Sequence, residues 1–458
     1  MKTNNPGASG VRYVYFITAV AALGGLLFGY DTAVIAGAIG SIETKFQLTP
    51  ALTGWAASSA IWGCVFGAMF AGFLSDRLGR KKVLLVTAVL FAISAIGSAL
   101  PNNLTQFVLA RFIGGVGVGA ASMLSPMYIS ELAPADKRGM LVTLYQLAIV
   151  LGINLIYFVN LKIAGMGSEA WNLETGWRLM LGSEAIPALL FLVALFFVPE
   201  SPRWLAGKNR DQEALGILVR INGPAKAAAV LDEVKSTLRQ EKGTIKELFA
   251  PGLRTAMLVG MFLALFSQIT GINAIIYYAP EIFKNVGFGT DSALFQTLII
   301  GIINTIFTFV AIKFIDQVGR RKLLLWGVSG MAICLIGVGI VFHFELNSGP
   351  LLLFFILGFI ASFDSSLGPI PWVIISEIFP TKTRGIAMSF ATFTLWIGVV
   401  LITQFTPVLL DRFGGAPTFW IFAVNAVILL LFTYFKIPET KGKTLEEIEH
   451  YWKGNDHA

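Results

Sequence analysis

Charged residues are scarce in this chain of 458 residues. Asp, Glu, Lys and Arg make up 13% of it and hydrophobic residues make up 55%. Soluble domains carry about 25% charged residues. A soluble protein of this length would need a charged surface that this chain lacks, so we expect lipid to cover most of its exterior.

Cysteine and histidine are also scarce. The two cysteines, Cys64 and Cys334, lie far apart inside apolar runs, which excludes a disulfide framework and a cysteine metal site. The three histidines form no cluster, and no phosphate-binding loop or Ser/His/Asp set is found. These absences exclude an enzyme and an ATP-driven pump, and we expect no cofactor and no metal.

Long hydrophobic runs dominate what is present. About 20 apolar residues are needed for a helix to cross the hydrocarbon core. The first run carries Asp31 and is too long for the apolar part of a signal peptide, so no cleavable leader is expected. The criterion predicts an all-α membrane protein with twelve spans, at 14–37, 53–74, 83–100, 105–127, 141–160, 178–198, 254–279, 293–314, 323–343, 351–375, 386–409 and 418–437.

Basic residues are concentrated in alternate loops. The opposite loops hold only Lys45, Lys162, Lys284 and Arg412. This asymmetry places the basic loops and both termini in the cytoplasm, so the sequence predicts a multi-pass protein of the inner or plasma membrane. It also accounts for the net charge of +7 without a nucleic-acid partner.

Three motifs recur in the same order at an offset of about 240 residues. They are Asp76-Arg77-Leu78-Gly79-Arg80-Lys81-Lys82 with Asp316-Gln317-Val318-Gly319-Arg320-Arg321-Lys322, Glu131-Leu132-Ala133-Pro134 with Glu377-Ile378-Phe379-Pro380, and Pro199-Glu200-Ser201 with Pro438-Glu439-Thr440. The repeat predicts two six-helix halves, 1–198 and 254–437. The tail is 438–458.

The segment 199–253 joins the two halves. Between 211 and 242 it places apolar residues at helical spacing among charged ones, namely Leu215, Leu218, Val219, Val230, Val234 and Leu238. It is predicted to form short amphipathic helices on the cytoplasmic face, either as a solvated connector or as part of a gate.

Ionisable residues at membrane depth are costly and usually functional. We interpret Asp31 as the proton-carrying group, Arg111 as its partner and Glu184, near the start of the sixth span, as a member of the same network. A permanent structural ion pair is the alternative. Asp364 is interpreted as a hinge or lining residue rather than a second proton site.

Uncharged polar and aromatic residues lie within the otherwise apolar spans. Amide side chains both donate and accept hydrogen bonds, which suits a neutral polyhydroxylated solute, and indole rings can stack on a sugar ring. Gly271 could unwind its helix and bring Gln268 and Asn273 together; hydrogen bonds that only join helices are the alternative. The candidate substrate-binding residues are Gln146, Gln268, Asn273, Tyr277, Asn304, Trp372 and Trp396.

Opposite charges gather on the predicted cytoplasmic side. They could hold that side closed in one state of a two-state carrier, or they could serve only as topology anchors. The candidate cytoplasmic gate consists of Asp76, Arg80, Glu131, Arg138, Glu200, Arg203, Asp316, Arg320, Glu377 and Arg384.

Several stretches resemble the signatures of the sugar porters of the major facilitator superfamily, over nearly the whole length. They are Gly25-Leu26-Leu27-Phe28-Gly29-Tyr30-Asp31, Gly72-Phe73-Leu74-Ser75-Asp76-Arg77-Leu78-Gly79-Arg80, Pro199-Glu200-Ser201-Pro202-Arg203-Trp204 and Pro438-Glu439-Thr440-Lys441-Gly442. Within the group, the chain is most similar to bacterial proton-coupled arabinose and xylose symporters. The resemblance implies the major facilitator fold, a proton site at Asp31 and Arg111, and sugar contacts from the amides and tryptophans named above.

Four positions depart from the pattern of that group. Ser267, Ile153, Leu395 and Val399 stand where many members carry Gln or Asn. The predicted pocket therefore has fewer hydrogen-bonding groups, which affects affinity and sugar identity rather than the class of solute.

The function expected from these features is symport of a proton with a monosaccharide by alternating access, in a monomer. Pentoses such as arabinose or xylose come first, and galactose or glucose next. A facilitative sugar uniporter is the alternative, since its fold would be the same. A transporter-like sugar sensor is a third reading, disfavoured by the short tail after the last span.

Overall fold

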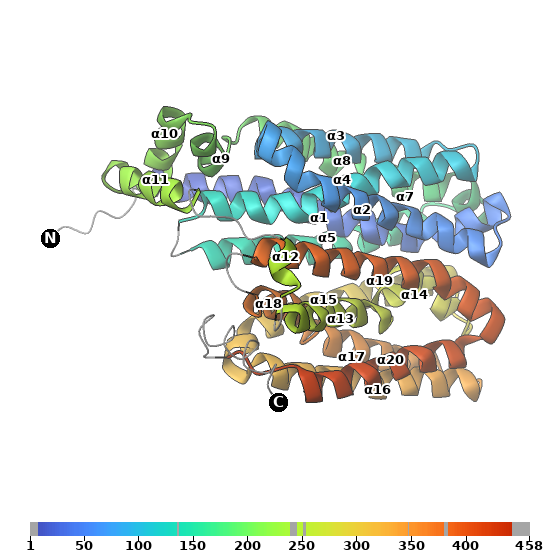
Figure 1. The fold of residues 1–458 in the computed structure, drawn as a ribbon. Coiled ribbons are helices and arrows are strands. Elements are labelled where there is room, and N and C mark those ends of the chain that lie inside the picture. Colours follow the sequence, from blue (N-terminus) through green and yellow to red (C-terminus); the bar gives the residue numbers. More distant parts are fainter. Residues whose placement is uncertain are drawn as a thin grey trace. The chain divides into compact units, whose positions relative to one another are not determined.

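The computed structural model describes residues 8–134, 137–238, 245–250, 253–346, 348–379 and 383–441. Every regular element in these ranges is a helix (Figure 1). A helix satisfies its own backbone polar groups, which lipid cannot do. Eleven of the described helical segments are long and apolar enough to span a membrane, and Gly349–Asp364 is a shorter apolar helix. These correspond to the twelve predicted spans.

The helices before the central linker continue past the predicted spans, because hydropathy marks only the part of a helix that crosses lipid. The sixth span is a series of short pieces that includes one π-helix, η1. The bounds are α1 (Ala8–Phe46), α2 (Pro50–Leu78), α3 (Arg80–Ala99), α4 (Leu104–Leu132), α5 (Arg138–Ala164), α6 (Glu169–Trp171), η1 (Asn172–Gly176), α7 (Trp177–Gly182) and α8 (Ala185–Phe196).

The later helices include two spans that are broken in the middle, between α13 and α14 and between α17 and α18. The bounds are α12 (Ile245–Leu248), α13 (Leu253–Ile269), α14 (Ile272–Lys284), α15 (Thr290–Val318), α16 (Arg320–His343), α17 (Gly349–Asp364), α18 (Ile370–Glu377), α19 (Arg384–Phe413) and α20 (Gly415–Lys436).

The chain forms two compact units. The first comprises residues 1–34, 62–156 and 178–241, and the second comprises 35–61, 157–177 and 242–458, counted over their described residues. In the first unit α3 packs against α4 and α8; in the second, α16 packs against both α17 and α20. The division into halves at 198 and 254 remains a prediction from the repeat.

Glycine allows α2 and α4 to approach closely in the first unit. A Cβ atom built on Gly119 would lie 2.7 Å from the backbone nitrogen of Ala68, and one built on Gly63 would lie 2.8 Å from that of Val116. No side chain fits at such distances, so only glycine permits this packing.

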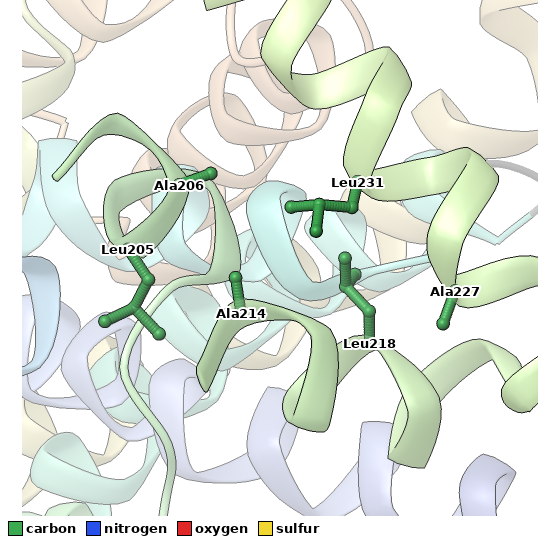
Figure 2. Close-up of a cluster of buried hydrophobic side chains, with 6 residues drawn as sticks. All are labelled: Leu205, Ala206, Ala214, Leu218, Ala227 and Leu231. Atoms are coloured by element: carbon green, nitrogen blue, oxygen red, sulfur yellow. The ribbon is translucent and has the colours of Figure 1, made fainter. Parts of the chain in front are cut away.

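The predicted amphipathic helices of the linker are present as α9 (Pro202–Gly207), α10 (Asp211–Asn222) and α11 (Pro224–Leu238). They gather at one end of the first unit (Figure 1) and bury an apolar cluster of their own (Figure 2). Of the predicted apolar positions, Leu218 is buried, whereas Val219 and Leu238 are exposed. The cluster consists of Leu205, Ala206, Ala214, Leu218, Ala227 and Leu231.

Candidate functional site

Asp31 and Arg111 form a fully buried ion pair in the first unit. Nη1 of Arg111 donates to Oδ1 of Asp31 at 2.6 Å, and Nη2 donates to the Asp31 backbone carbonyl at 2.9 Å. Their side chains are 1% or less exposed. A guanidinium that binds both the carboxylate and the carbonyl of one residue fixes α1 against α4, because a buried pair is stable only when its geometry is satisfied.

Glu184 joins this pair as a second buried carboxyl group. It immediately precedes α8, in the middle of the span Glu169–Phe196, so its predicted place near the start of the span was wrong. The shift arises because α6 and η1 continue the helical path before residue 178. It is buried close to Asp31 and Arg111, and Oε1 of Glu184 and Oδ2 of Asp31 are both buried without a hydrogen-bond partner among the described residues.

A proton shared between these two carboxyl groups would give their oxygens a hydrogen bond, because a protonated carboxyl donates one. Two carboxyls and one guanidinium balance in charge when that proton is present, which is the arrangement a buried site favours. Beside them the hydroxyls of Tyr30 and Ser183 lie 2.8 Å apart. Asp31, Glu184 and Arg111 therefore form a candidate proton-binding site.

Gly271 interrupts the seventh span, as the sequence analysis expected. Its φ of +98° lies in the left-handed region, between the end of α13 at Ile269 and the start of α14 at Ile272. The break turns Asn273 towards Gln268, and Nδ2 of Asn273 donates to Oε1 of Gln268 at 2.8 Å. The two amides therefore form one polar pair in the second unit.

The other predicted sugar contacts differ in exposure. In the second unit, Tyr277, Asn304 and Trp396 are buried, whereas Trp372 is 39% exposed. Nδ2 of Asn304 donates to Oδ1 of Asp364 at 3.3 Å. Gln146 lies on α5 in the first unit and is exposed.

The four departures from the family pattern are all buried. Ile153, Leu395 and Val399 are apolar, and the hydroxyl of Ser267 donates to the Ala264 carbonyl at 2.7 Å and accepts from Nε2 of Gln268 at 3.1 Å. Ser267 therefore orients the amide of Gln268, a contact that the sequence analysis missed.

The first copy of the repeated charged motif is held together by ion pairs and hydrogen bonds inside the first unit. Arg80 pairs with Glu131 at 3.1 Å and with Asp76 at 2.9 Å. The carboxylate of Glu200 accepts from the backbone nitrogens of Arg80, Lys81 and Ser201 and so caps the N-terminus of α3.

The repeated motif reproduces this arrangement in the second unit. Arg320 pairs with Glu377 at 3.0 Å, and the carboxylate of Glu439 accepts from the backbone nitrogens of Arg320, Arg321 and Lys441. The two Pro-Glu motifs are thus helix caps, a function that the sequence analysis did not assign to them.

Four members of the candidate gate remain outside these clusters. Arg138 and Arg203 are exposed, and neither forms an ion pair within the described part of the chain. The side chains of Asp316 and Arg384 lie outside the described residues.

A second set of contacts lies at the opposite ends of the helices, called here the outer ends, and belongs to the second unit. Hydroxyl Oγ of Ser58 lies 2.6 Å from Oε1 of Gln404, and Nε2 of Gln404 donates to the Ala51 carbonyl at 3.1 Å. Tyr157 donates to the Ile276 carbonyl at 2.9 Å. These contacts join α2 to α19 and α5 to α14, and sequence reasoning missed them because the partners are far apart in the chain.

Comparisons with known proteins agree with this architecture. The arabinose-proton symporter of Bacillus subtilis is 49% identical over 441 residues, which cover 96% of this chain and 95% of that protein. The D-xylose-proton symporter of Escherichia coli K12 is 42% identical, with 96% of both chains covered.

Solved structures of the xylose transporter XylE from E. coli share the fold. The inward open conformation matches with a TM-score of 0.87 at 41% identity, covering 96% of this chain and 100% of that one. XylE bound to 6-bromo-6-deoxy-D-glucose, described as a major facilitator superfamily proton:xylose symporter, matches with a TM-score of 0.78 at 41% identity, covering 97% and 100%.

The family model "Sugar (and other) transporter" matches residues 17–452. The twelve-helix architecture, the break at Gly271, the repeated motifs and these relatives lead to one conclusion: the chain belongs to the sugar transporter family of the major facilitator superfamily.

Proposed function

We propose that this protein is a proton-coupled symporter of a pentose such as arabinose or xylose and works by alternating access. Relatives named as arabinose-proton and D-xylose-proton symporters match almost the full chain at 42–49% identity. The observation that carries the coupling is the buried group of Asp31, Glu184 and Arg111, in which two carboxyl groups share one guanidinium and one oxygen of each carboxyl lacks a hydrogen-bond partner among the described residues.

In the proposed cycle, the proton resides between Asp31 and Glu184. When it is present, the two carboxyls and Arg111 balance in charge, and α1 is held to α4 and to the joint before α8. When it leaves, a second negative charge must be accommodated beside a single guanidinium, which changes the relative stability of the two states of the carrier. By linkage, a proton that favours sugar binding is itself bound more tightly when sugar is present.

Sugar contacts are proposed for Gln146, Gln268, Asn273, Tyr277, Asn304, Trp372 and Trp396. The hydrogen-bonded amides of Gln268 and Asn273 support this assignment, because each retains further donors or acceptors for hydroxyl groups. The cytoplasmic gate, the cytoplasmic placement of both termini, the inner or plasma membrane and the monomeric state are also proposals, which rest on the charge bias and the repeat.

The decisive experiment is uptake of labelled arabinose, xylose, galactose and glucose into proteoliposomes, with and without an inward proton gradient. We expect the wild type to accumulate a pentose above equilibrium only with the gradient. Asp31→Asn is expected to abolish accumulation while sugar exchange persists. Asp411→Asn, which neutralises an exposed aspartate, is the matched control and should behave as the wild type.

A facilitative uniporter is the second candidate, because a structural ion pair between Asp31 and Arg111 would have the same geometry. Equilibration without accumulation in wild type and in Asp31→Asn would establish it and reject coupling.

A further inference from the structure

A third buried carboxyl group lies in the second unit, apart from the Asp31 site. Asp364 is 6% exposed and is the last residue of α17, at the break before α18. A carboxylate at a helix C-terminus faces the negative end of the helix dipole. Both its burial and its place in the helix therefore disfavour the ionised form.

The hydrogen bonds around Asp364 do not compensate for a negative charge. Its Oδ1 accepts from Nδ2 of Asn304 at 3.3 Å, and its Oδ2 is buried without a partner among the described residues. The neighbouring hydroxyls of Ser365 and Ser366 donate instead to carbonyls of their own helix, each at 2.6 Å. A stable carboxylate normally accepts two or three good hydrogen bonds.

No positive charge in the described part of the chain stabilises this carboxyl group. No ion pair to Asp364 is found among the described residues, and the last turn of α17 contains no basic residue. The elements packed against α17 are α14, α15 and α16, and α18 follows it. Their titratable residues are Tyr277, Tyr278, Glu281, Lys284, Asp291, Lys313, Asp316, Arg320, Arg321, Lys322, Cys334, His343 and Glu377, and for Asp316 the side chain lies outside the described residues.

The amide beside Asp364 is also incompletely satisfied. Oδ1 of Asn304 is buried without a partner among the described residues, and so is Oδ2 of Asp364. One acceptor on each group lacks a donor, and a proton on the Asp364 carboxyl would supply one. The pair thus has the composition of a proton-binding site.

We propose that Asp364 binds and releases a second proton during the transport cycle, and that the hydrogen bonding between Asp364 and Asn304 depends on whether this proton is bound. Asn304 is a proposed sugar contact, so the link to sugar rests on the proposed function, whereas proton binding by Asp364 does not. This assignment revises the sequence interpretation of Asp364 as a hinge or lining residue.

The test is infrared spectroscopy of the full chain in lipid, with protons as the only ligand. We expect the wild type to show the carbonyl stretch of a protonated carboxyl that is lost in Asp364→Asn and retained in Asp411→Asn. The same band should decline as the pH rises while the protein stays folded. A spectrum unchanged by Asp364→Asn would overturn the proposal, as would a band that never responds to pH.

A second variant guards against loss of folding in Asp364→Asn. When aspartate is labelled with carbon-13, the carbonyl band of the wild type should shift in frequency. In Asp364→Glu the band should keep its frequency, because the protonated carboxyl then belongs to an unlabelled glutamate. A band that still follows the aspartate label in Asp364→Glu would reject the assignment. Uptake by Asp31→Asn is a separate measurement, so failure of symport and failure of this site are distinguishable.

Discussion

Arg111 holds two functions in one side chain, since it neutralises Asp31 and binds the backbone of α1. Its Nη1 and Nη2 bond the carboxylate and the carbonyl of the same residue. Glu184 adds a second buried carboxyl group, and no ion pair to a second cation is found for it among the described residues. If the proposed proton site is correct, the charge balance of this group changes with one proton, and we expect the relative stability of the two carrier states to change with it.

Removal of the cation should destabilise the fold. Arg111→Met leaves two buried carboxyls without their partner, and breaking a buried pair in this way costs about 3–5 kcal/mol. Thermal unfolding in detergent should show a clearly lower midpoint. The triple variant Arg111→Met, Asp31→Asn, Glu184→Gln should recover most of the stability and remain unable to accumulate sugar. A triple variant as unstable as Arg111→Met would show that packing rather than charge is at fault.

At the scale of single residues, the sequence predicted the members of the candidate proton site but not their contacts. Asp31, Arg111 and Glu184 were visible because each is charged within an apolar run. Their hydrogen-bonding pattern was not, because it depends on tertiary contacts between residues 80 positions apart in the case of Asp31 and Arg111. Ser267 was named in the sequence analysis, but its hydrogen bond with the Gln268 amide was not predicted, because the sequence does not show how the two side chains are oriented.

At the scale of the element, the break between α13 and α14 depends on one residue. Gly271 has φ of +98°, and a Cβ built on it would lie 2.6 Å from the ring of Phe422. Any other residue would be strained both in its backbone and in its contact.

Gly271→Ala should therefore lower the free energy of unfolding by about 1–3 kcal/mol, because alanine would be held in the left-handed backbone conformation that only glycine adopts without strain. We expect a lower midpoint of thermal unfolding. We also expect the affinity for sugar to fall by a larger fraction than the helix content measured by circular dichroism. Gly289→Ala is the control, because Gly289 also precedes a helix but has φ of −68° and open space around its Cβ position. Equal effects of both variants would contradict the assignment of strain to Gly271.

The linker bundle has a core of its own, so its stability can be tested separately. Leu218→Ala removes a buried side chain of α10, and such truncations cost about 2–5 kcal/mol. Faster hydrogen exchange is expected across α9, α10 and α11, and exchange in α16 and α20 should be unchanged. Val219→Ala, at the exposed neighbouring position, should leave exchange as in the wild type. Uniform exchange across all helices after Leu218→Ala would show that the bundle is not independent.

Hydropathy predicted the elements well because transfer into lipid selects apolar runs of fixed length. It did not reveal that α6 and η1 continue the sixth span before α7 and α8, since residues 169–176 are mostly polar and precede the apolar run. It also stopped short of the ends of α1, which extend to Ala8 and Phe46 beyond the hydrocarbon-length core.

At the scale of the whole molecule, we expect the contacts at the outer ends to be present in only one state of the proposed alternating cycle. Gln404 uses both its amide oxygen and its amide nitrogen to bind α2. These bonds join α2 to α19, so they must break when the outer ends separate, as alternating access requires.

Gln404→Leu should shift the carrier towards the state with separated outer ends. Two hydrogen bonds are together worth about 1–2 kcal/mol, which corresponds to roughly a 5- to 30-fold change in the equilibrium. The measure is labelling of Ser59→Cys, a fully buried position of α2, by a membrane-impermeant thiol reagent after Cys64 and Cys334 are replaced.

The control for this measurement is Thr406→Val, which removes a hydroxyl that bonds only within α19. It should leave the labelling rate unchanged. Labelling that is equally fast in Thr406→Val and Gln404→Leu, or unchanged in Gln404→Leu, would show that Gln404 does not hold the outer ends together.

The apolar cluster of α9, α10 and α11 also bears on how the chain is made. Its members lie between Leu205 and Leu231, so every contact in it is short in sequence. Helices and short loops close in microseconds, whereas ribosomes add about 5–20 residues per second. The bundle can therefore fold as soon as Leu231 has left the ribosome, before α13 has emerged, so the second set of spans is expected to emerge behind a small bundle that has already folded.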